Sequence, residues 1–394
     1  MTGKNSQVEG LKYFLNTNFK AALWAIAPAC GAALALLLLA AGVGRATGSG
    51  VIAFVSHRNN VNEIFLVDVA TGQTRSLLSG AAFHDAFSPL WSPDGQRLAF
   101  TARFPNDDAR VSSAFNSEVM VMNTGQGSPL NLTGHAADRE YLADWSPDGQ
   151  HILFLSNRNS AFGAYGEREF TNLFVMDVDC EGCSARQLGS FDLFNARPRW
   201  SPDGRRILFA APGYLDSPDP LADMDWDTEI YVVNSDGSDL RQLTHNDEYD
   251  GLPAWSPDGA QIAFLSPLIG QTRVYLMNAD GSQLRSLAGG RLSEYFNGET
   301  ALVWSPDGRY LATVFYPDGA PDICRIEVAT GEVRNLTRHP NADQSPVWSS
   351  DSRRLAFTSN RNGNLDIYVM DADGANMRNL TTHPAVDYSP AWWP

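Results

Sequence analysis

Short hydrophobic segments separated by turn-forming residues recur in a fixed order through residues 51–394. One segment is apolar, as in 97–101, and the next alternates apolar and polar positions, as in 230–233. A more polar segment ending in Leu-Thr and a segment ending in Pro-x-Trp complete the unit, as in 241–244 and 253–255. Four short strands in every 44–55 residues, with turn residues between them, predict antiparallel sheet throughout.

The unit is marked by the pentapeptide Trp-Ser-Pro-Asp-Gly. Five intact copies, one degenerate copy and one truncated copy follow one another at spacings of 54, 55, 55, 49, 44 and 44 residues. A fixed period of this length is typical of a repeat architecture. Proline and glycine suit the second and fourth positions of a type I turn, and the Trp is predicted to pack between neighbouring sheets. The copies begin at Trp91, Trp145, Trp200, Trp255, Trp304, Trp348 and Trp392.

Repeated four-stranded units predict an all-β fold, a seven-bladed β-propeller, with six blades as the alternative. The array begins with the first strand of a unit and ends on a Trp strand. We therefore expect the last strand, near 389–393, to pair with residues 51–56, so that the two chain ends complete one blade. First strands are predicted at 51–56, 97–102, 151–156, 206–211, 261–266, 310–315 and 354–359.

The pattern differs before the repeats. Residues 21–43 contain no charge, and at about 1.5 Å per residue the run is long enough to cross a hydrocarbon core of roughly 30 Å. Three Lys precede the run and one Arg follows it, which predicts a cytoplasmic tail at 1–20 and a single-pass signal anchor at 21–43. Residues 44–50 form a linker, and the propeller at 51–394 is then periplasmic or extracellular. A signal peptide cleaved near 41–46 is the alternative.

Charge narrows the range of partners. The formal net charge is −16, and residues 51–394 hold 25 basic and 44 acidic side chains. Such a domain should repel phosphate backbones, so no nucleic-acid partner is expected. Cys180 and Cys183 form one Cys-x-x-Cys at a predicted hairpin tip, where a local disulfide could form outside the cytoplasm. Cys324 alternates with apolar residues and is predicted to be buried.

The Trp-Ser-Pro-Asp-Gly copies, the segment 366–374 and the Asn-Leu-Thr sequences resemble the WD40-like repeat of TolB-type propeller proteins, over residues 51–394. The resemblance implies a propeller and a link to the bacterial envelope. TolB-type proteins also carry an N-terminal α/β domain, for which the chain before residue 51 is too short. The repeat is also similar to the propeller of prolyl-oligopeptidase-like enzymes, but no Gly-x-Ser-x-Gly or His-Glu-x-x-His sequence occurs here.

Loop lengths suggest where a ligand would bind. Because successive strands alternate in direction, the Pro-Asp-Gly turns share one face and the longer loops share the other. Long loops are predicted at 103–117, 157–171 and 212–227. Variable loops on a rigid scaffold commonly bind ligands, so a protein, peptide or glycan is expected on this face. The aromatic candidates are Phe104, Phe115, Phe162, Tyr165, Tyr214 and Trp226.

Carboxylates supply two candidate metal sites. Asp223, Asp225 and Asp227 alternate in one long loop, and hard oxygen ligands so spaced could hold Ca²⁺. Acidic residues also recur five positions before the repeat Trp, where they would form a ring at the channel mouth that binds a metal ion or a basic segment. The alternative is that each bonds to local backbone amides. The ring comprises Glu140, Asp250, Glu299, Asp343 and Asp387.

These observations predict a membrane-anchored, extracytoplasmic propeller that acts as a protein- or ligand-binding scaffold, and they favour binding over catalysis. Two alternatives stay open. One is a TolB-like envelope or transport-associated factor. The other is a metal-dependent carbohydrate-active enzyme that uses the channel mouth.

Overall fold

The computed structural model is built of β-strands and turns in the residues that it describes. These are 50–58, 60–78, 83–105, 115–125, 127–134, 139–158, 164–165, 168–169, 171–179, 184–191, 193, 197–212, 228–267, 272–289, 302–316 and 319–394. Among them no helix is long and apolar enough to cross a membrane. The predicted anchor at 21–43 lies outside the described residues.

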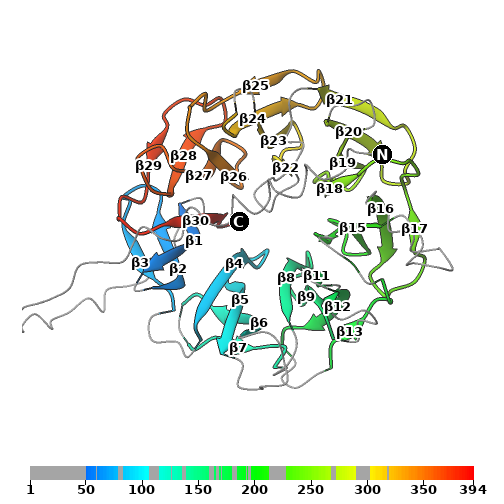
Figure 1. Cartoon of the computed structure of the whole chain (residues 1–394), viewed down its shortest axis with the longest axis horizontal. Coiled ribbons are helices and arrows are strands. Elements are labelled where there is room, and N and C mark those ends of the chain that lie inside the picture. The colour runs from blue at the N-terminus through cyan, green and yellow to red at the C-terminus, as the bar shows by residue number, and fades with distance from the viewer. Residues whose placement is uncertain are drawn as a thin grey trace, which may run out of the picture. The chain divides into compact units, whose positions relative to one another are not determined.

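The described strands form seven four-stranded antiparallel sheets and a two-stranded hairpin. The seven sheets surround a common centre as the blades of a propeller, which confirms the predicted fold and excludes six blades (Figure 1). Blade 1 contains β30 (Asp387–Trp392), β1 (Val51–Arg58), β2 (Val61–Asp68) and β3 (Thr74–Ser76); blade 2 contains β4 (Asp85–Trp91), β5 (Arg97–Pro105), β6 (Phe115–Asn123) and β7 (Leu130–Asn131); blade 3 contains β8 (Glu140–Trp145), β9 (His151–Ser156), β12 (Asn172–Asp177) and β13 (Arg186–Gln187). Blade 4 contains β14 (Arg199–Trp200), β15 (Arg206–Pro212), β16 (Thr228–Asn234) and β17 (Arg241–Gln242); blade 5 contains β18 (Gly251–Trp255), β19 (Gln261–Ser266), β20 (Arg273–Asn278) and β21 (Arg285–Gly289); blade 6 contains β22 (Leu302–Trp304), β23 (Tyr310–Phe315), β24 (Asp322–Glu327) and β25 (Val333–Asn335); blade 7 contains β26 (Asp343–Trp348), β27 (Arg354–Ser359), β28 (Asp366–Asp371) and β29 (Arg378–Asn379); the hairpin is β10 (Ala164–Tyr165) with β11 (Arg168–Glu169).

The two ends of the repeat array meet in blade 1. Strand β30 pairs antiparallel with β1, with Ile52 opposite Trp392 and Ser56 opposite Asp387. The red β30 therefore lies beside the blue β1 in Figure 1. This is the predicted pairing, and it closes the ring because the last repeat supplies the inner strand that the first repeat lacks.

Hydrophobic packing joins each blade to the next. Seven clusters of buried side chains each draw their members from two adjacent blades. At the junction of blades 2 and 3, for example, Val119 and Val121 pack in one cluster with Trp145 and Phe154. The repeat Trp lies in these junctions as predicted, because a flat blade can bury its two faces only against its neighbours.

Indole hydrogen bonds reinforce four of the junctions. The Nε1 of Trp145 donates to the carbonyl of Leu90 at 3.1 Å, and Leu90 directly precedes the repeat Trp of the previous blade. The same bond recurs from Trp91 to Ala391, from Trp304 to Ala254 and from Trp348 to Val303, at 3.0–3.1 Å. The Trp therefore contributes both apolar area and a polar link between inner strands.

The polar residues of the Pro-Asp-Gly turns form hydrogen bonds within the turn itself. In the first copy, Gly95 N donates to Ser92 O at 2.8 Å, as in a type I turn, and the Ser92 hydroxyl donates to Asp94 Oδ1 at 2.6 Å. That hydroxyl bond lowers the pKa of Asp94 and, by the same contact, of Asp148, Asp203 and Asp258. Gly95 has φ of 67°, and a Cβ there would lie 2.5 Å from the Trp393 ring. Both the left-handed backbone and the close ring therefore require glycine at this position.

A bulge bends most of the inner strands three residues before the Trp. Ser88, Ser345 and Ser389 occupy this position in blades 2, 7 and 1, with φ between 51° and 53°. Arg197 in blade 4 and Leu252 in blade 5 occupy it with φ of 43° and 52°. The left-handed conformation is therefore a property of the repeat, whereas the side chain it carries differs between blades.

We expect Trp348→Phe to lower the free energy of unfolding by about 1 kcal/mol more than Trp255→Phe does, the net value of one hydrogen bond. Both side chains are buried, but the Nε1 of Trp255 has no hydrogen-bond partner, whereas that of Trp348 bonds to Val303. Chemical denaturation of the two variants measures the difference. Equal losses of stability would show that the indole bond contributes nothing to the junction.

Candidate functional site

A cavity of about 440 Å³ lies among the inner strands of blades 4–7, and we call it the axial cavity. Residues from four inner strands can line one space only near the centre about which the blades are arranged. Residues of the Pro-Asp-Gly turns also line it, which places it toward the face that carries those turns. Its walls are formed by Arg197, Arg199, Trp200, Pro202, Leu252, Pro253, Ala254, Trp255, Ser256, Pro257, Leu302, Val303, Trp304 and Val347.

Two guanidinium groups supply charge to the axial cavity. Arg199 begins β14, the inner strand of blade 4, and Arg197 lies two residues before it; both line the same space. Arg199 is exposed, and its Nη1 donates to Ala143 O at 2.5 Å, while Arg197 is partly buried. Burial, together with the neighbouring Arg199, lowers the pKa of Arg197. A second positive charge nearby and partial desolvation both make an anion favourable at this position.

Asp144 lies near this pair but does not line the cavity. It is partly buried, and its carboxylate accepts the backbone N–H of Trp145 at 3.0 Å and that of Trp200 at 2.9 Å. Burial raises the pKa of Asp144, and attraction to Arg199 opposes that shift. Asp144 thus offsets part of the charge of Arg199 from outside the cavity.

Two Trp residues that line the axial cavity have indole N–H groups buried within its walls. Trp200 and Trp255 are 8% and 7% exposed, and their Nε1 atoms have no hydrogen-bond partner. They differ in this from the four Trp whose Nε1 bonds to the previous blade. Unsatisfied buried donors are uncommon in folded proteins, and here both occur in blades that line the axial cavity.

The described carboxylates of the predicted ring lie in separate blades, each buried at the start of its own inner strand. Glu140, Asp343 and Asp387 occupy the first position of their inner strands, and Asp250 lies just before β18, as the spacing required. All four are fully buried. In the described part of the chain, no three His, Cys, Asp or Glu side chains gather so as to hold a metal ion. Glu299 lies outside the described residues.

A Ser-x-Arg sequence at the end of the adjacent strand partners three of these carboxylates. In blade 7, Arg361 Nη2 lies 2.8 Å from Asp343 Oδ2, and Arg361 Nε donates to the Ser359 hydroxyl at 2.9 Å. In blade 3, Arg158 Nε bonds to Glu140 at 2.8 Å and to Ser156 at 3.0 Å.

Blade 1 repeats the arrangement with a longer ion pair. Arg58 Nη2 lies 4.0 Å from Asp387, Arg58 Nε donates to Ser56 at 2.8 Å, and the guanidinium stacks 4.0 Å from the centre of the Phe65 ring. Burial raises the pKa of Asp387. We call these three groups the Ser-x-Arg clamps, and their carboxylates serve to hold strands together.

Asp250 in blade 5 faces no Ser-x-Arg sequence, since Pro267 and Leu268 follow Ser266. Its Oδ2 accepts from Asn246 Nδ2 at 2.8 Å, and its Oδ1 has no partner. Burial raises the pKa of Asp250. The position is thus acidic and buried in blades 1, 3, 5 and 7, whereas Ala86 occupies it in blade 2, and the group that balances the carboxylate differs between blades.

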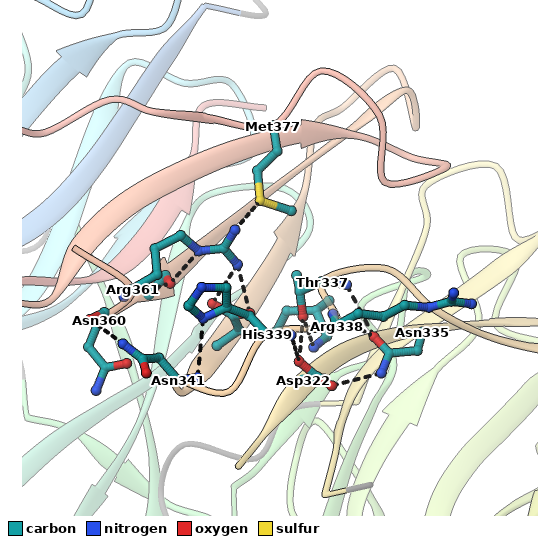
Figure 2. Close-up of polar contacts among 12 residues, drawn as sticks. Asp322, Asn335, Thr337, Arg338, His339, Asn341, Asn360, Arg361 and Met377 are labelled. Carbon is teal, nitrogen blue, oxygen red and sulfur yellow. Dashed lines mark hydrogen bonds and ion pairs between the residues drawn. The ribbon is translucent and has the colours of Figure 1, made fainter. Parts of the chain in front are cut away.

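A second cavity of about 700 Å³ lies at blade 6, on the face that carries the longer loops. Figure 2 shows that its polar groups already bond to one another. Asp322 accepts from the Thr337 hydroxyl at 3.0 Å, the His339 backbone at 3.0 Å and the Asn335 amide at 2.7 Å. His339 Nδ1 accepts from Asn341 N at 3.1 Å. These contacts hold the outer strand and its following loop in place.

The predicted loop-face aromatics are placed in different ways. Phe104 lies in β5, and its ring meets that of Phe83 edge-on at 6.1 Å, so it packs within the propeller. Phe115 lies in β6 and Tyr165 in the hairpin β10. Cys324 is buried as predicted, and burial raises the pKa of its thiol to about 12. The remaining candidates lie outside the described residues: Phe162, Tyr214, Trp226, Asp223, Asp225, Asp227, Cys180 and Cys183.

Comparison with known proteins agrees with this architecture. The family model described as the TolB beta propeller domain matches residues 46–211, 161–301 and 300–394. The chain belongs to the TolB beta-propeller domain family. The match spans all seven blades, so the repeat resemblance is confirmed at the level of the family.

Relatives of this TolB-type propeller have diverse descriptions. It is 26% identical over 205 residues to the uncharacterized peptidase YuxL of Bacillus subtilis, covering 46% of this chain and 29% of that protein. It is 36% identical over 154 residues to dipeptidyl-peptidase 5 of Porphyromonas gingivalis, covering 39% of this chain and 20% of that protein. It is also 26% identical over 152 residues to the Tol-Pal system protein TolB of Francisella tularensis, covering 38% and 31%. The chain thus spans less than a third of each of these relatives.

Solved structures share the fold. An oligogalacturonate lyase from Vibrio parahaemolyticus superposes with a TM-score of 0.60 at 17% identity, covering 81% of this chain and 85% of that one. A puromycin hydrolase superposes with a TM-score of 0.62 at 17% identity, covering 85% and 52%. Identity this low establishes the shared propeller and no shared activity.

Sequence reasoning missed both the Ser-x-Arg clamps and the axial arginines, although each left a signal. The tripeptides at 56–58, 156–158 and 359–361 repeat Ser-x-Arg in the same slot. Arg197 stands where three other blades have Ser, and Arg199 stands where the other repeats have Leu, Asp, Ala or Val. Aligning the repeats for departures from the common residue, rather than for agreement, would have identified the two arginines.

We expect Arg361→Met to lower the free energy of unfolding by about 3–5 kcal/mol, because it leaves the buried carboxylate of Asp343 without its charged partner. Arg334→Met, at an exposed position, is the control and should cost no more than about 0.5 kcal/mol. Adding Asp343→Asn to Arg361→Met should restore part of the loss. Similar losses for the two Arg variants in urea denaturation would rule out a clamp role for Arg361.

Proposed function

We propose that this chain is a membrane-anchored, extracytoplasmic binding module that holds a ligand in the axial cavity without converting it. The axial cavity is the observation that carries the proposal. Its volume of about 440 Å³ falls in the range of small-molecule sites, roughly 300–1,000 Å³. Four blades of a closed ring contribute to its walls, so its shape is fixed by packing rather than by a single loop.

The chemistry of the cavity walls supports binding over turnover. The walls combine apolar side chains with a few convergent hydrogen-bond donors, the usual composition of a ligand site. A guanidinium stays protonated at physiological pH, so it orients a ligand rather than exchanging protons with it. The hydroxyl of Ser256 is used by its own turn, where it donates to Asp258 at 2.5 Å and accepts from Gln261 N at 2.9 Å.

Blocking the cavity tests this proposal. We expect ligand-observed NMR of the full-length protein, with a panel of neutral, acidic and basic small molecules, to detect compounds that bind the wild type and are recovered unchanged. Ala254→Phe, inside the cavity, should abolish that binding. Ala260→Phe adds the same ring at an exposed turn position and should leave binding intact. Binding that survives Ala254→Phe, or compounds recovered chemically altered, would contradict the proposal.

The anchor is a separate part of the proposal, and it rests on the uncharged run at 21–43. We expect the full-length protein to stay in the membrane pellet after alkaline carbonate washing, because the apolar segment would remain in the bilayer. A variant that begins at residue 44 should be released. Release of the full-length protein, or a mature mass that lacks 1–43, would contradict a retained anchor.

A further inference from the structure

The axial cavity is positively charged within a strongly acidic protein. Of the described residues that line it, two are arginines and none is acidic, although residues 51–394 hold 44 acidic side chains against 25 basic ones. The two guanidinium groups are close enough for Arg199 to lower the pKa of Arg197. Because no carboxylate in the described part of the chain lines the cavity beside these two guanidinium groups, the walls favour an anionic ligand.

The backbone geometry shows that this charge is not required by the fold. Arg197 sits at the left-handed bulge position that holds Ser88, Ser345 and Ser389 in other blades. Arg199 directly precedes the repeat Trp, at the position that holds Val303 and Val347 in blades 6 and 7. Smaller, uncharged residues therefore satisfy the same backbone in the same ring.

The remaining walls define the rest of the ligand. Apolar surface comes from Leu252, Leu302, Val303 and Val347, and three Trp residues line the same space. Arg197 and Arg199 therefore supply the charged donors of the site, and most of its other side chains are apolar.

We infer that the axial cavity binds a carboxylate carried on an apolar body, with Arg197 and Arg199 as the groups that recognise the carboxylate. A guanidinium presents its N–H groups as a planar fork that matches the two oxygens of a carboxylate. Its five N–H donors allow Arg199 to keep its bond to Ala143 while it binds the ligand. The apolar body would be an aromatic or aliphatic acid, or the C-terminal residues of an apolar peptide. This inference rests on the proposed function and names its ligand class.

The test compares acids with amides of the same shape. Calorimetric titration of the full-length protein uses benzoate, phenylacetate and hexanoate beside benzamide, phenylacetamide and hexanamide. An N-acetylated apolar tripeptide, with a free or an amidated C-terminus, forms the second arm. We expect at least one acid or free C-terminus to bind ten or more times as tightly as its amide. Selective binding of a small acid or of the peptide with a free C-terminus identifies which of the two supplies the carboxylate.

Variants assign the effect to the two arginines. Arg197→Ser and Arg199→Val introduce residues that other blades already carry at these positions, so the ring should stay folded, as thermal unfolding will show. Each should weaken binding of the acid at least tenfold and leave binding of the amide unchanged. Arg241→Ser, which removes an exposed Arg paired with Asp239, is the charge-matched control and should change neither.

The outcomes separate this inference from the proposed function. Equal affinity for acids and amides, or full affinity for acids in Arg197→Ser and Arg199→Val, overturns the carboxylate inference and leaves a neutral-ligand module standing. If Ala254→Phe abolishes the binding of none of the acids and amides, both the carboxylate inference and the proposed function are overturned. Selective, arginine-dependent binding of acids supports both.

Discussion

Every blade of this protein depends on its neighbours, because a four-stranded sheet with two apolar faces is stable only when both faces are covered. Seven hydrophobic junctions provide that cover. One of them, between blades 7 and 1, includes Trp392 of β30, the strand that pairs with β1. Without that pairing, two apolar faces and two sheet edges would meet water, so the contact between the ends of the array governs the whole ring.

The same constraint explains why polar groups lie deep between the strands. An inner strand must begin close to the axis and be held to the strand beside it. The Ser-x-Arg clamps do this in three blades with a carboxylate, a hydroxyl and a stacked guanidinium. A buried carboxylate is costly unless it is paired, so each clamp fixes the position of Arg as firmly as that of Asp or Glu. The predicted ring of ligands is thus a set of separate carboxylates, of which Glu140 and Asp343 are closely paired with Arg and Asp387 lies 4.0 Å from Arg58.

Repetition made the architecture predictable from the sequence. Seven copies of a pattern locate each first strand, and turn chemistry at Pro and Gly sets where it begins, so the predicted 51–56 and 354–359 match β1 and β27 closely. The candidate site was harder to predict, because its residues depart from the repeated pattern. Asp343 was identified because acidic residues recur at its position in the repeat, and that recurrence reflects a structural role. Arg197 and Arg199 were overlooked because no other repeat has Arg at either position. Side-chain distances across the axis, between residues more than a hundred positions apart such as Arg197 and Val347, have no local signal in the chain.

Direct observation of a bound ligand is the best test of the proposed binding site at the axis of this ring. Crystals of the protein grown with 4-bromobenzoate allow the bromine to be located by its anomalous scattering. The account predicts a bromine peak inside the axial cavity, with the carboxylate about 2.7–2.9 Å from a guanidinium nitrogen of Arg197 or Arg199. A bromine peak confined to the loop face, or a saturated crystal with no ligand in the axial cavity, would contradict it.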